Sequence, residues 1–392
     1  MARGTEDAAG AGEGEPGILL RLLACWAGFR LGRGHDTMPA MEYESRIAVD
    51  ARPGLLRGAL PYWRQAAQLG LAGALMAGLL WRVDLAAVRA EVESATLWWL
   101  PLAFVANLAS DWFRAIRWQR FFAPLKRLSV RFLFAVAVLG VAVNLALPMR
   151  AGEFVRVQVL RRRTGLKAGS IVATLLSEKL MDVVAFSSFI VLGIVLYEEA
   201  HFLWPLAVAY GAVLTAGLFG ARWLAGRAQS GPHNEDTIGG PAKRAGGVAN
   251  WVRYEMHSLG EGLQAFRRPR AMFDVVWASQ AAWLCEAVMF YACGRALGLD
   301  LPPAVYLLVV VAATIAVSVP LTQAGLGVFE LAIAGLLVAF GVDEAQAAAF
   351  AIFSHVMLAL PYFVTGPMAA VALRLNLADI FFLRLGKEEA SA

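Results

Sequence analysis

One apolar segment of the chain is interrupted at Asn144-Leu-Ala-Leu-Pro148-Met-Arg150-Ala-Gly152-Glu153, the first break, and another at Ser318-Val-Pro320-Leu-Thr-Gln323-Ala-Gly325-Leu-Gly327-Val-Phe-Glu330, the second break. Proline lacks a backbone N–H and glycine loosens the backbone, so we expect no helix to run through either stretch. Within a bilayer, unpaired backbone is tolerated only where protein buries it or water lines it. Paired interruptions in two halves of a membrane protein point to a transporter's substrate site.

The composition places both breaks in a membrane protein. The chain has 392 residues, of which 59% are hydrophobic and 17% charged. Soluble domains have about 45–50% apolar residues, so we predict an all-α, polytopic membrane protein. The net charge of +5 arises from Lys and Arg spread between the apolar segments. That spread suits cytoplasmic loops beside anionic lipid and argues against nucleic-acid binding.

Three regions differ in composition. Residues 1–60 are rich in Gly, Ala, Glu and Arg, and we expect a disordered or interfacial extension. Residues 61–376 form the predicted transmembrane domain, and 377–392 a cytoplasmic tail. A cytoplasmic loop is expected at 226–268. Its first half reads as a linker and its second half as an interfacial helix, with Trp251, Leu259, Leu263 and Phe266 near one face.

Charge asymmetry orients the predicted spans. Arginines precede the first span, residues 66–81, and acidic residues follow it, which places the N-terminus in the cytoplasm. The second span, residues 96–118, returns to a basic segment. The further full spans are expected at residues 171–197, 202–224, 273–297 and 347–373. The last one ends among basic residues, so the C-terminus is also predicted to be cytoplasmic.

The apolar run at residues 132–147 precedes the first break and a strongly basic segment, 153–167. A full crossing by residues 132–147 would put these basic residues outside, against the positive-inside bias. We therefore predict that residues 132–160 form a re-entrant hairpin from the cytoplasm. Residues 304–319 and 327–341 flank the second break, and either two crossings or a hairpin from outside fits their charge. A hairpin there would make the two halves inverted repeats.

Several charges lie where the bilayer makes them costly, at about 2.5–3.5 kcal/mol for Asp, Lys or Arg at a helix centre. Glu178, Lys179 and Asp182 fall inside one predicted span and share a helix face. They form either a neutralised structural cluster or a polar wall that faces a lipid headgroup or an ion.

Each break adds candidate headgroup ligands. In the first, Glu153 and Arg156 are spaced to pair on one helical turn, whereas Arg150 suits bidentate phosphate binding. The alternative for Arg150 is an ion pair with Glu178 or Asp182.

The second break offers Gln323 and the backbone amides of Gly325 and Gly327, ahead of a helix that is expected to begin near Val328. A helix N-terminus attracts anions. Glu330 lies in the first turn, where it either contributes to that site or caps the helix.

Other polar residues have more ordinary interpretations. Glu286 lies in mid-span and is either an ion-coupling group or a partner in an interhelical hydrogen bond. Asp111 and Arg114 are three residues apart, and we expect them to pair. His355 is expected to be a packed, hydrogen-bonding residue. Cys285 and Cys293 share one predicted helix and cannot form a disulfide without breaking it. The sequence has no Cys or His spacing for a metal and no nucleotide-binding motif, so we predict no metal, no cofactor and no catalytic residue.

The chain resembles the lysylphosphatidylglycerol synthase transmembrane, or flippase-like, family over about residues 65–375. The matching pieces are Arg114-Ala-Ile-Arg117-Trp118, Asn144…Pro148-Met-Arg150-Ala-Gly152-Glu153-Phe-Val-Arg156, Glu178-Lys179-Leu-Met-Asp182 and Pro320…Ala324-Gly325-Leu-Gly327-Val-Phe-Glu330. Lys179 and His355 stand where arginine is expected in such proteins. Bifunctional members also carry an aminoacyltransferase domain, which we do not recognise in these residues, so we expect no synthase activity.

The resemblance implies translocation of a lipid or lipid-linked headgroup between leaflets of a bacterial inner membrane. The lipid would be an anionic phospholipid or a polyprenyl-linked lipid. Two alternatives stay open. The chain is a non-transporting partner of a separate lipid-modifying enzyme, or it is a polyprenyl-phosphate-dependent transferase that uses Glu153 and Asp182 as a metal-binding pair. A homo-oligomer is compatible with either.

Overall fold

The computed structural model describes residues 62–147, 150–229, 259–260, 263–267, 269–318 and 321–375. Among these residues every regular element is a helix, which confirms the all-α prediction. The expectations for residues 1–60, for the tail at 377–392 and for most of the loop at 226–268 fall outside the described residues. Pro148 and Pro320 themselves also lie outside them.

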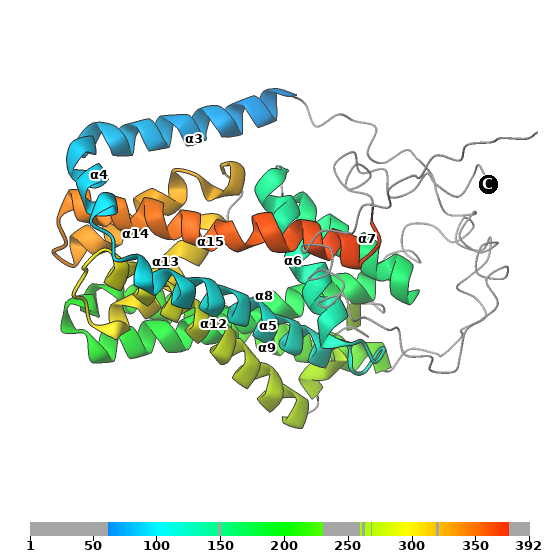
Figure 1. Cartoon of the computed structure of the whole chain (residues 1–392). Helices are drawn as coiled ribbons and strands as arrows, with labels where there is room; N and C mark the ends of the chain where they lie inside the picture. Colours follow the sequence, from blue (N-terminus) through cyan, green and yellow to red (C-terminus); the bar gives the residue numbers. More distant parts are fainter. Residues whose placement is uncertain are drawn as a thin grey trace, which may run out of the picture. The chain divides into compact units, whose positions relative to one another are not determined.

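Figure 1 labels the α-helices. The described elements are α3 Tyr62–Arg82, α4 Leu85–Glu93, η1 Leu97–Trp99, α5 Leu100–Phe122, α6 Val130–Ala146, α7 Ala151–Thr164, α8 Ala168–Leu196, η2 Glu198–Leu203, α9 Trp204–Gln229, η4 Gln264–Arg267, α12 Pro269–Ala296, α13 Pro303–Ser318, η5 Gln323–Gly325, α14 Val328–Ala339 and α15 Glu344–Ala372.

Four of these segments are long and apolar enough to cross a bilayer: Ala168–Leu196, Glu198–Leu224, Arg270–Ala296 and Glu344–Ala372. They coincide with four of the predicted spans. The predicted first span lies in α3 and qualifies only together with α4, from which it is bent by 89°. The predicted second span corresponds to α5, which has the length but carries Asp111, Arg114 and Arg117 in its middle. The chain is a multi-pass membrane protein.

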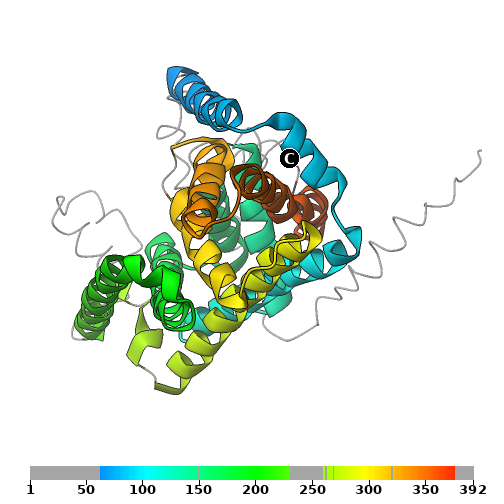
Figure 2. The ribbon, with the colours of Figure 1, turned by 90° about the vertical axis from the view of Figure 1, so that its left-hand side faces the viewer.

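The helices pack around α5, α12 and α15. The most extensive contact joins α5 to α12, and α15 packs against α6 and α14. Helix α9 packs mainly against α8, lies at the edge of the bundle in Figure 2, and buries none of its most apolar window. A helix with so little buried surface must present its apolar side chains to lipid.

The first break separates two closely packed helices. A Cβ atom on Gly152 of α7 would lie 1.8 Å from the carbonyl oxygen of Gly140 in α6, so only glycine fits at this crossing. The Nζ atom of Lys126, just before α6, donates to the carbonyl oxygen of Thr164 at the end of α7, at 2.8 Å. The chain therefore returns at the end of α7 to the place where it entered α6.

The second break separates α13 from η5 and α14. At the ends of α13 and α14 that lie away from this break, the Tyr306 ring contacts the Tyr291 ring at 5.4 Å between centroids, and the Phe340 ring contacts the Tyr197 ring at 5.1 Å. Tyr291 is near the end of α12, and Tyr197 directly follows α8. Both ends of the α13–α14 pair thus lie beside the terminal turns of long helices.

The described part of the loop at 226–268 corrects one expectation. Leu263 and Phe266 are buried, and the Phe266 ring stacks on Phe121 of α5 at 6.0 Å. These side chains belong to the protein core and not to an interfacial face. Because Phe121 and Phe122 already project from α5, burying Leu263 and Phe266 there removes more apolar surface from water than laying them on headgroups would.

Candidate functional site

The two breaks contact each other through reciprocal side-chain caps. The Arg150 guanidinium, from the first break, donates to the Val317 carbonyl near the end of α13. Conversely, the Gln323 amide, from the second break, donates to the Leu145 carbonyl near the end of α6, at 3.1 Å. Helices leave their last carbonyl groups without partners, which is costly inside a membrane. Each break therefore satisfies backbone that the other exposes.

The backbone at both breaks is left-handed at a residue with a side chain. Arg150 has φ 55° and Ala324 has φ 54°. Such a conformation costs about 1–2 kcal/mol for an L-residue, so the surrounding contacts must hold it. One of these contacts is the Asn144 side chain, whose Oδ1 accepts from the Gly152 N–H at 2.7 Å and satisfies a free amide of α7.

Arg156 joins two carboxylates beside the first break. It donates to Glu178 of α8 at 2.8 Å and to Glu153 at 3.1 Å, which confirms the predicted one-turn pair. Its guanidinium also lies 4.1 Å from the centre of the Trp118 ring. A planar guanidinium can make all these contacts at once, whereas a lysine ammonium cannot.

Asp182 lies one turn further along α8 and is the centre of a second polar cluster. Its Oδ1 atom accepts from Arg117 at 2.8 Å and from the Trp283 indole at 3.0 Å. Lys179 approaches the other carboxylate oxygen at 3.5 Å, and its own side chain is 60% exposed. Asp182 and Arg117 are both buried, so this pair is structural, while Lys179 keeps an accessible charge.

The two carboxylates that we considered as partners of Arg150 each pair with another arginine. Glu178 binds Arg156, and Asp182 binds Arg117. No carboxylate of a described residue pairs with Arg150.

The structure corrects the expected pairing of Arg114 with Asp111. It binds Glu286 of α12, not Asp111, and it lies 4.1 Å from the centre of the Trp283 ring. The Ser110 hydroxyl donates to the same carboxylate at 3.4 Å. Of the two interpretations of Glu286, this geometry corresponds to the interhelical hydrogen bond. The ion-coupling role stays a prediction.

At the second break, Glu330 caps α14 from within the chain. Its Oε2 atom accepts from the Gly327 N–H at 2.7 Å, and its Oε1 atom lies 2.6 Å from Nδ1 of His355. The Phe329 ring stacks on His355 at 4.1 Å. His355 is thus a packed residue, as expected. Gly325 and Gly327 both have left-handed φ angles. The Gly327 N–H, a predicted donor to an external anion, instead donates to the carboxylate of Glu330.

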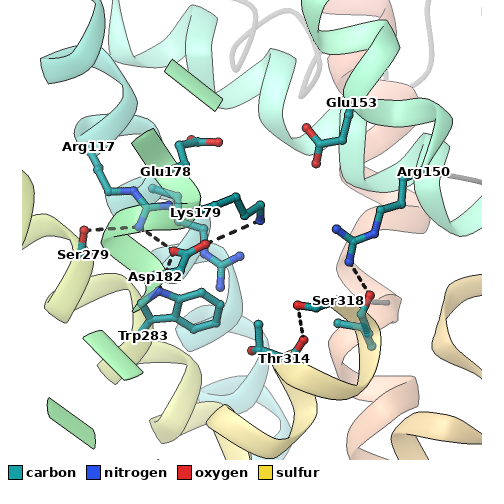
Figure 3. Close-up of polar contacts among 12 residues, drawn as sticks. Arg117, Arg150, Glu153, Glu178, Lys179, Asp182, Ser279, Trp283, Thr314 and Ser318 are labelled. Atoms are coloured by element: carbon teal, nitrogen blue, oxygen red, sulfur yellow. Dashed lines mark hydrogen bonds and ion pairs between the residues drawn. The ribbon is translucent and has the colours of Figure 1, made fainter. Parts of the chain in front are cut away.

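Figure 3 shows Arg150 and Glu153, from the first break, facing Lys179 of α8. We call the region between them the hollow. Ser318 lies at its edge, at the end of α13. Four cations and three carboxylates belong to this region: Arg117, Arg150, Arg156 and Lys179, with Glu153, Glu178 and Asp182. Arg114, Glu286 and Asp111 adjoin this region, and with them the cations and carboxylates are equal in number. Arg150 and Lys179 are the least neutralised cations of the site.

The structure thus brings together Arg150, Glu153, Arg156, Glu178, Lys179, Asp182 and Gln323. It places Glu330, Gly325 and Gly327 at the cap of α14 and Glu286 in the cluster with Arg114. Sequence reasoning did not propose Arg114, Arg117 or Trp283 as site residues. The signal for the two arginines was their spacing of three within an apolar helix, which puts both on one face.

Within the described part of the chain, no group of three or more His, Cys, Asp or Glu side chains could hold a metal ion. Glu153 and Asp182, the pair that a metal-dependent transferase would use, are engaged by different arginines.

Comparison with known proteins gives one family. The profile of the lysylphosphatidylglycerol synthase TM region matches residues 65–366, which include both breaks and all the polar clusters described above. No curated protein matches the chain. Since the match covers most of the chain, this multi-pass membrane protein belongs to the lysylphosphatidylglycerol synthase TM-region family, which ties it to lipid metabolism.

Proposed function

We propose that this protein moves the headgroup of an anionic lipid between the two leaflets of a bacterial inner membrane. The observation that carries the proposal is the meeting of the two breaks beside Arg150 and Lys179, the two least neutralised cations of the site. A phosphate is the anionic group that a bidentate guanidinium such as Arg150 recognises well.

The proposed path uses two re-entrant hairpins. Helices α6 and α7 have 17 and 14 residues, or about 26 and 21 Å at 1.5 Å per residue, and neither reaches the length of about 20 residues that a span needs. The contact of Lys126 with Thr164 supports entry and exit at the same face. That face would be cytoplasmic because α7 ends in Arg161, Arg162 and Arg163.

The second hairpin would enter from the opposite face. Helices α13 and α14 have 16 and 12 residues, too few for full crossings. Their far ends lie beside the terminal turns of α8 and α12. Two hairpins from opposite faces that meet at their tips form an inverted arrangement, in which substrate sites lie near the midplane.

In this scheme the reciprocal caps give the protein two states. With the caps made, Arg150 satisfies the Val317 carbonyl. A phosphate that draws Arg150 away would free that carbonyl and loosen the end of α13, while Lys179 offers a second cationic contact. The sequence has no nucleotide-binding motif, so movement would be downhill or coupled to an ion gradient.

The proposal is tested in liposomes that contain a fluorescent phosphatidylglycerol and a membrane-impermeant quencher. Wild-type protein should expose inner-leaflet lipid faster than empty liposomes do. Arg150→Ala should slow exposure by about tenfold, the loss expected for a charged hydrogen bond. Arg150→Lys should recover only part of the rate, because an ammonium lacks the bidentate fork.

Arg120→Ala is the matched control. Arg120 lies in α5 and forms an ion pair with Asp274, and both side chains are nearly half exposed. It carries the same guanidinium as Arg150 but is not one of the residues of the hollow. Its rate should equal that of wild type. A wild-type rate equal to that of empty liposomes would contradict transport and favour a partner role beside a lipid-modifying enzyme. Equal rates for Arg150→Ala and wild type would remove Arg150 from the mechanism.

A further inference from the structure

A cavity of about 450 Å³ lies between α8, α9, α13 and α14. The side chains that line it are all apolar: Ile190, Leu203, Leu206, Leu308, Val311, Ala312, Ile315, Ala316, Leu321, Val328, Ala332 and Leu336. Ile315 and Leu321 are 37% and 49% exposed, so one side of the cavity is open. We call it the apolar groove.

The apolar groove and the cationic hollow lie beside neighbouring stretches of α8. Ile190 in the groove and Lys179 in the hollow are eleven residues apart along this helix, or about 16 Å. Phe186, between them, is buried, and its ring lies 4.5 Å from that of Trp283. The surface of α8 therefore does not join the two sites.

Helix α13 joins the groove to the hollow. Ile315 and Ala316 line the groove, and the next two residues, Val317 and Ser318, belong to the hollow. At the other end, Leu308 of the groove packs on Gly193, close to the end of α8. The groove therefore extends from the terminal turn of α8 to the second break, where the Arg150 guanidinium lies.

We infer that the apolar groove holds one hydrocarbon chain of the anionic lipid whose headgroup enters the hollow. This inference rests on the proposed function, and it adds that one lipid tail leaves the bulk bilayer during the movement. The apolar groove suits the hydrocarbon tail of such a lipid, and the weakly neutralised cations Arg150 and Lys179 suit its anionic headgroup.

A hydrocarbon chain is also the occupant that the lining tolerates. A peptide segment in the groove would leave its backbone N–H and C=O groups without partners, because no lining side chain offers a hydrogen bond. A lipid tail has no such groups. The small side chains of Ala312 and Ala332 provide the width, since larger residues at these positions would fill the slot.

Native mass spectrometry with added lipid tests the inference. Purified wild-type protein should retain phosphatidylglycerol and the single-tailed lysophosphatidylglycerol, and it should bind glycerol phosphate, which has no tail, more weakly. Ala312→Phe with Ala332→Phe should weaken phosphatidylglycerol binding by about tenfold or more, because the two rings would occupy the space in which the tail buries its CH₂ groups. Val208→Phe, on the lipid-facing surface of α9, is the control and should bind as wild type does.

A second measurement does not depend on the folding of the filled variant. With the three native cysteines replaced, a fluorophore on Ile315→Cys should be quenched by brominated phosphatidylglycerol in a saturable way, at lower lipid concentration than by brominated phosphatidylcholine. The same fluorophore on Val208→Cys should show no saturation and no headgroup preference. Identical quenching at both positions, or equal binding by the filled variant and wild type, would overturn the inference.

The two proposals fail separately. If liposomes with wild-type protein show no movement of lipid, but Ile315→Cys still reports saturable anionic lipid, the groove stands and the transport function falls. If lipid moves equally fast with wild type and with the filled variant, and both bind lipid equally, transport stands and the groove assignment falls.

Discussion

Arg150 combines strain and function in one residue. Its backbone is left-handed, its guanidinium caps α13, and no described carboxylate neutralises it. The other arginines of the site differ, because each is fixed by a buried acidic partner: Arg156 by Glu178 and Arg117 by Asp182. Burial of such pairs gives specific geometry and little net stability, since desolvation offsets their attraction.

The variants Arg150→Gly and Arg150→Ala distinguish the backbone strain at this position from the role of the guanidinium. Arg150→Gly should be more stable than Arg150→Ala by up to about 1 kcal/mol, because glycine adopts positive φ without a steric cost. Both variants should lose lipid movement to the same extent. Thermal unfolding in detergent and the liposome assay measure the two effects. At Arg161, an exposed residue within α7, the order of stability should reverse, as a glycine there weakens the helix. The same order at both positions would contradict the argument.

Arg117 and Asp182 should contribute to the stability of the protein as a coupled pair. Arg117→Met leaves a buried carboxylate with Lys179 at 3.5 Å and should cost about 3 kcal/mol or more in stability. The double variant Arg117→Met/Asp182→Leu should recover much of that loss, because neither charge remains. A double-mutant cycle of thermal unfolding measures the coupling. The exposed pair Arg89–Glu93 should show coupling below about 1 kcal/mol. Additive losses at Arg117 and Asp182 would show that they do not act as a pair.

At the scale of the element, glycine decides how closely the broken helices pack. α6 and α7 approach so closely that a Cβ on Gly152 meets backbone, and α6 also approaches α15 where Ala142 faces Gly366. Small residues allow membrane helices to come close, because packing and not water drives their association. This contact fixes the start of α7 against α6 directly after the first break.

Gly152→Ala should therefore abolish the folded protein. The new methyl group would lie 1.8 Å from the Gly140 oxygen, and backbone cannot move as a flexible side chain does. The yield of monodisperse protein after extraction measures the effect. Gly335→Ala is the matched control on α14, where nothing lies within 4 Å of the added atom. It should be neutral or stabilising by up to about 1 kcal/mol, the helix preference of alanine over glycine. Normal yield of Gly152→Ala would contradict this packing.

At the scale of the whole molecule, the two breaks support each other across about 170 residues of sequence. Such reciprocal support couples two helix pairs, α6 with α7 and α13 with α14, that are distant in the sequence. It also satisfies carbonyl groups near the ends of α6 and α13, which would be costly to leave unpaired in a bilayer.

Loss of a cap should loosen the opposite break. Gln323→Leu removes the donor to Leu145 and should raise amide hydrogen exchange around residues 141–153, far from the substitution in sequence. Ser318→Ala is the control, because among the described residues its hydroxyl donates to the Thr314 carbonyl in its own helix and contacts no group of the first break. Hydrogen exchange with mass spectrometry compares the two variants. Unchanged exchange at the first break in Gln323→Leu would show that the caps do not couple the hairpins.

The sequence by itself determined the class of the protein, four of its spans, the location of both breaks, and the contacts between near neighbours such as Glu153 with Arg156 and Lys179 with Asp182. Apolar content and helical spacing are local properties, so they act before the chain packs.

Only the tertiary structure decided which distant groups meet. Arg114 pairs with Glu286 and not with the nearby Asp111, and Arg150 donates to the Val317 carbonyl and not to Glu178 or Asp182. Several partners of opposite charge were compatible with each arginine. The choice among them depended on how α5, α8 and α12 pack, because a buried charge takes the partner that packing brings within hydrogen-bond distance.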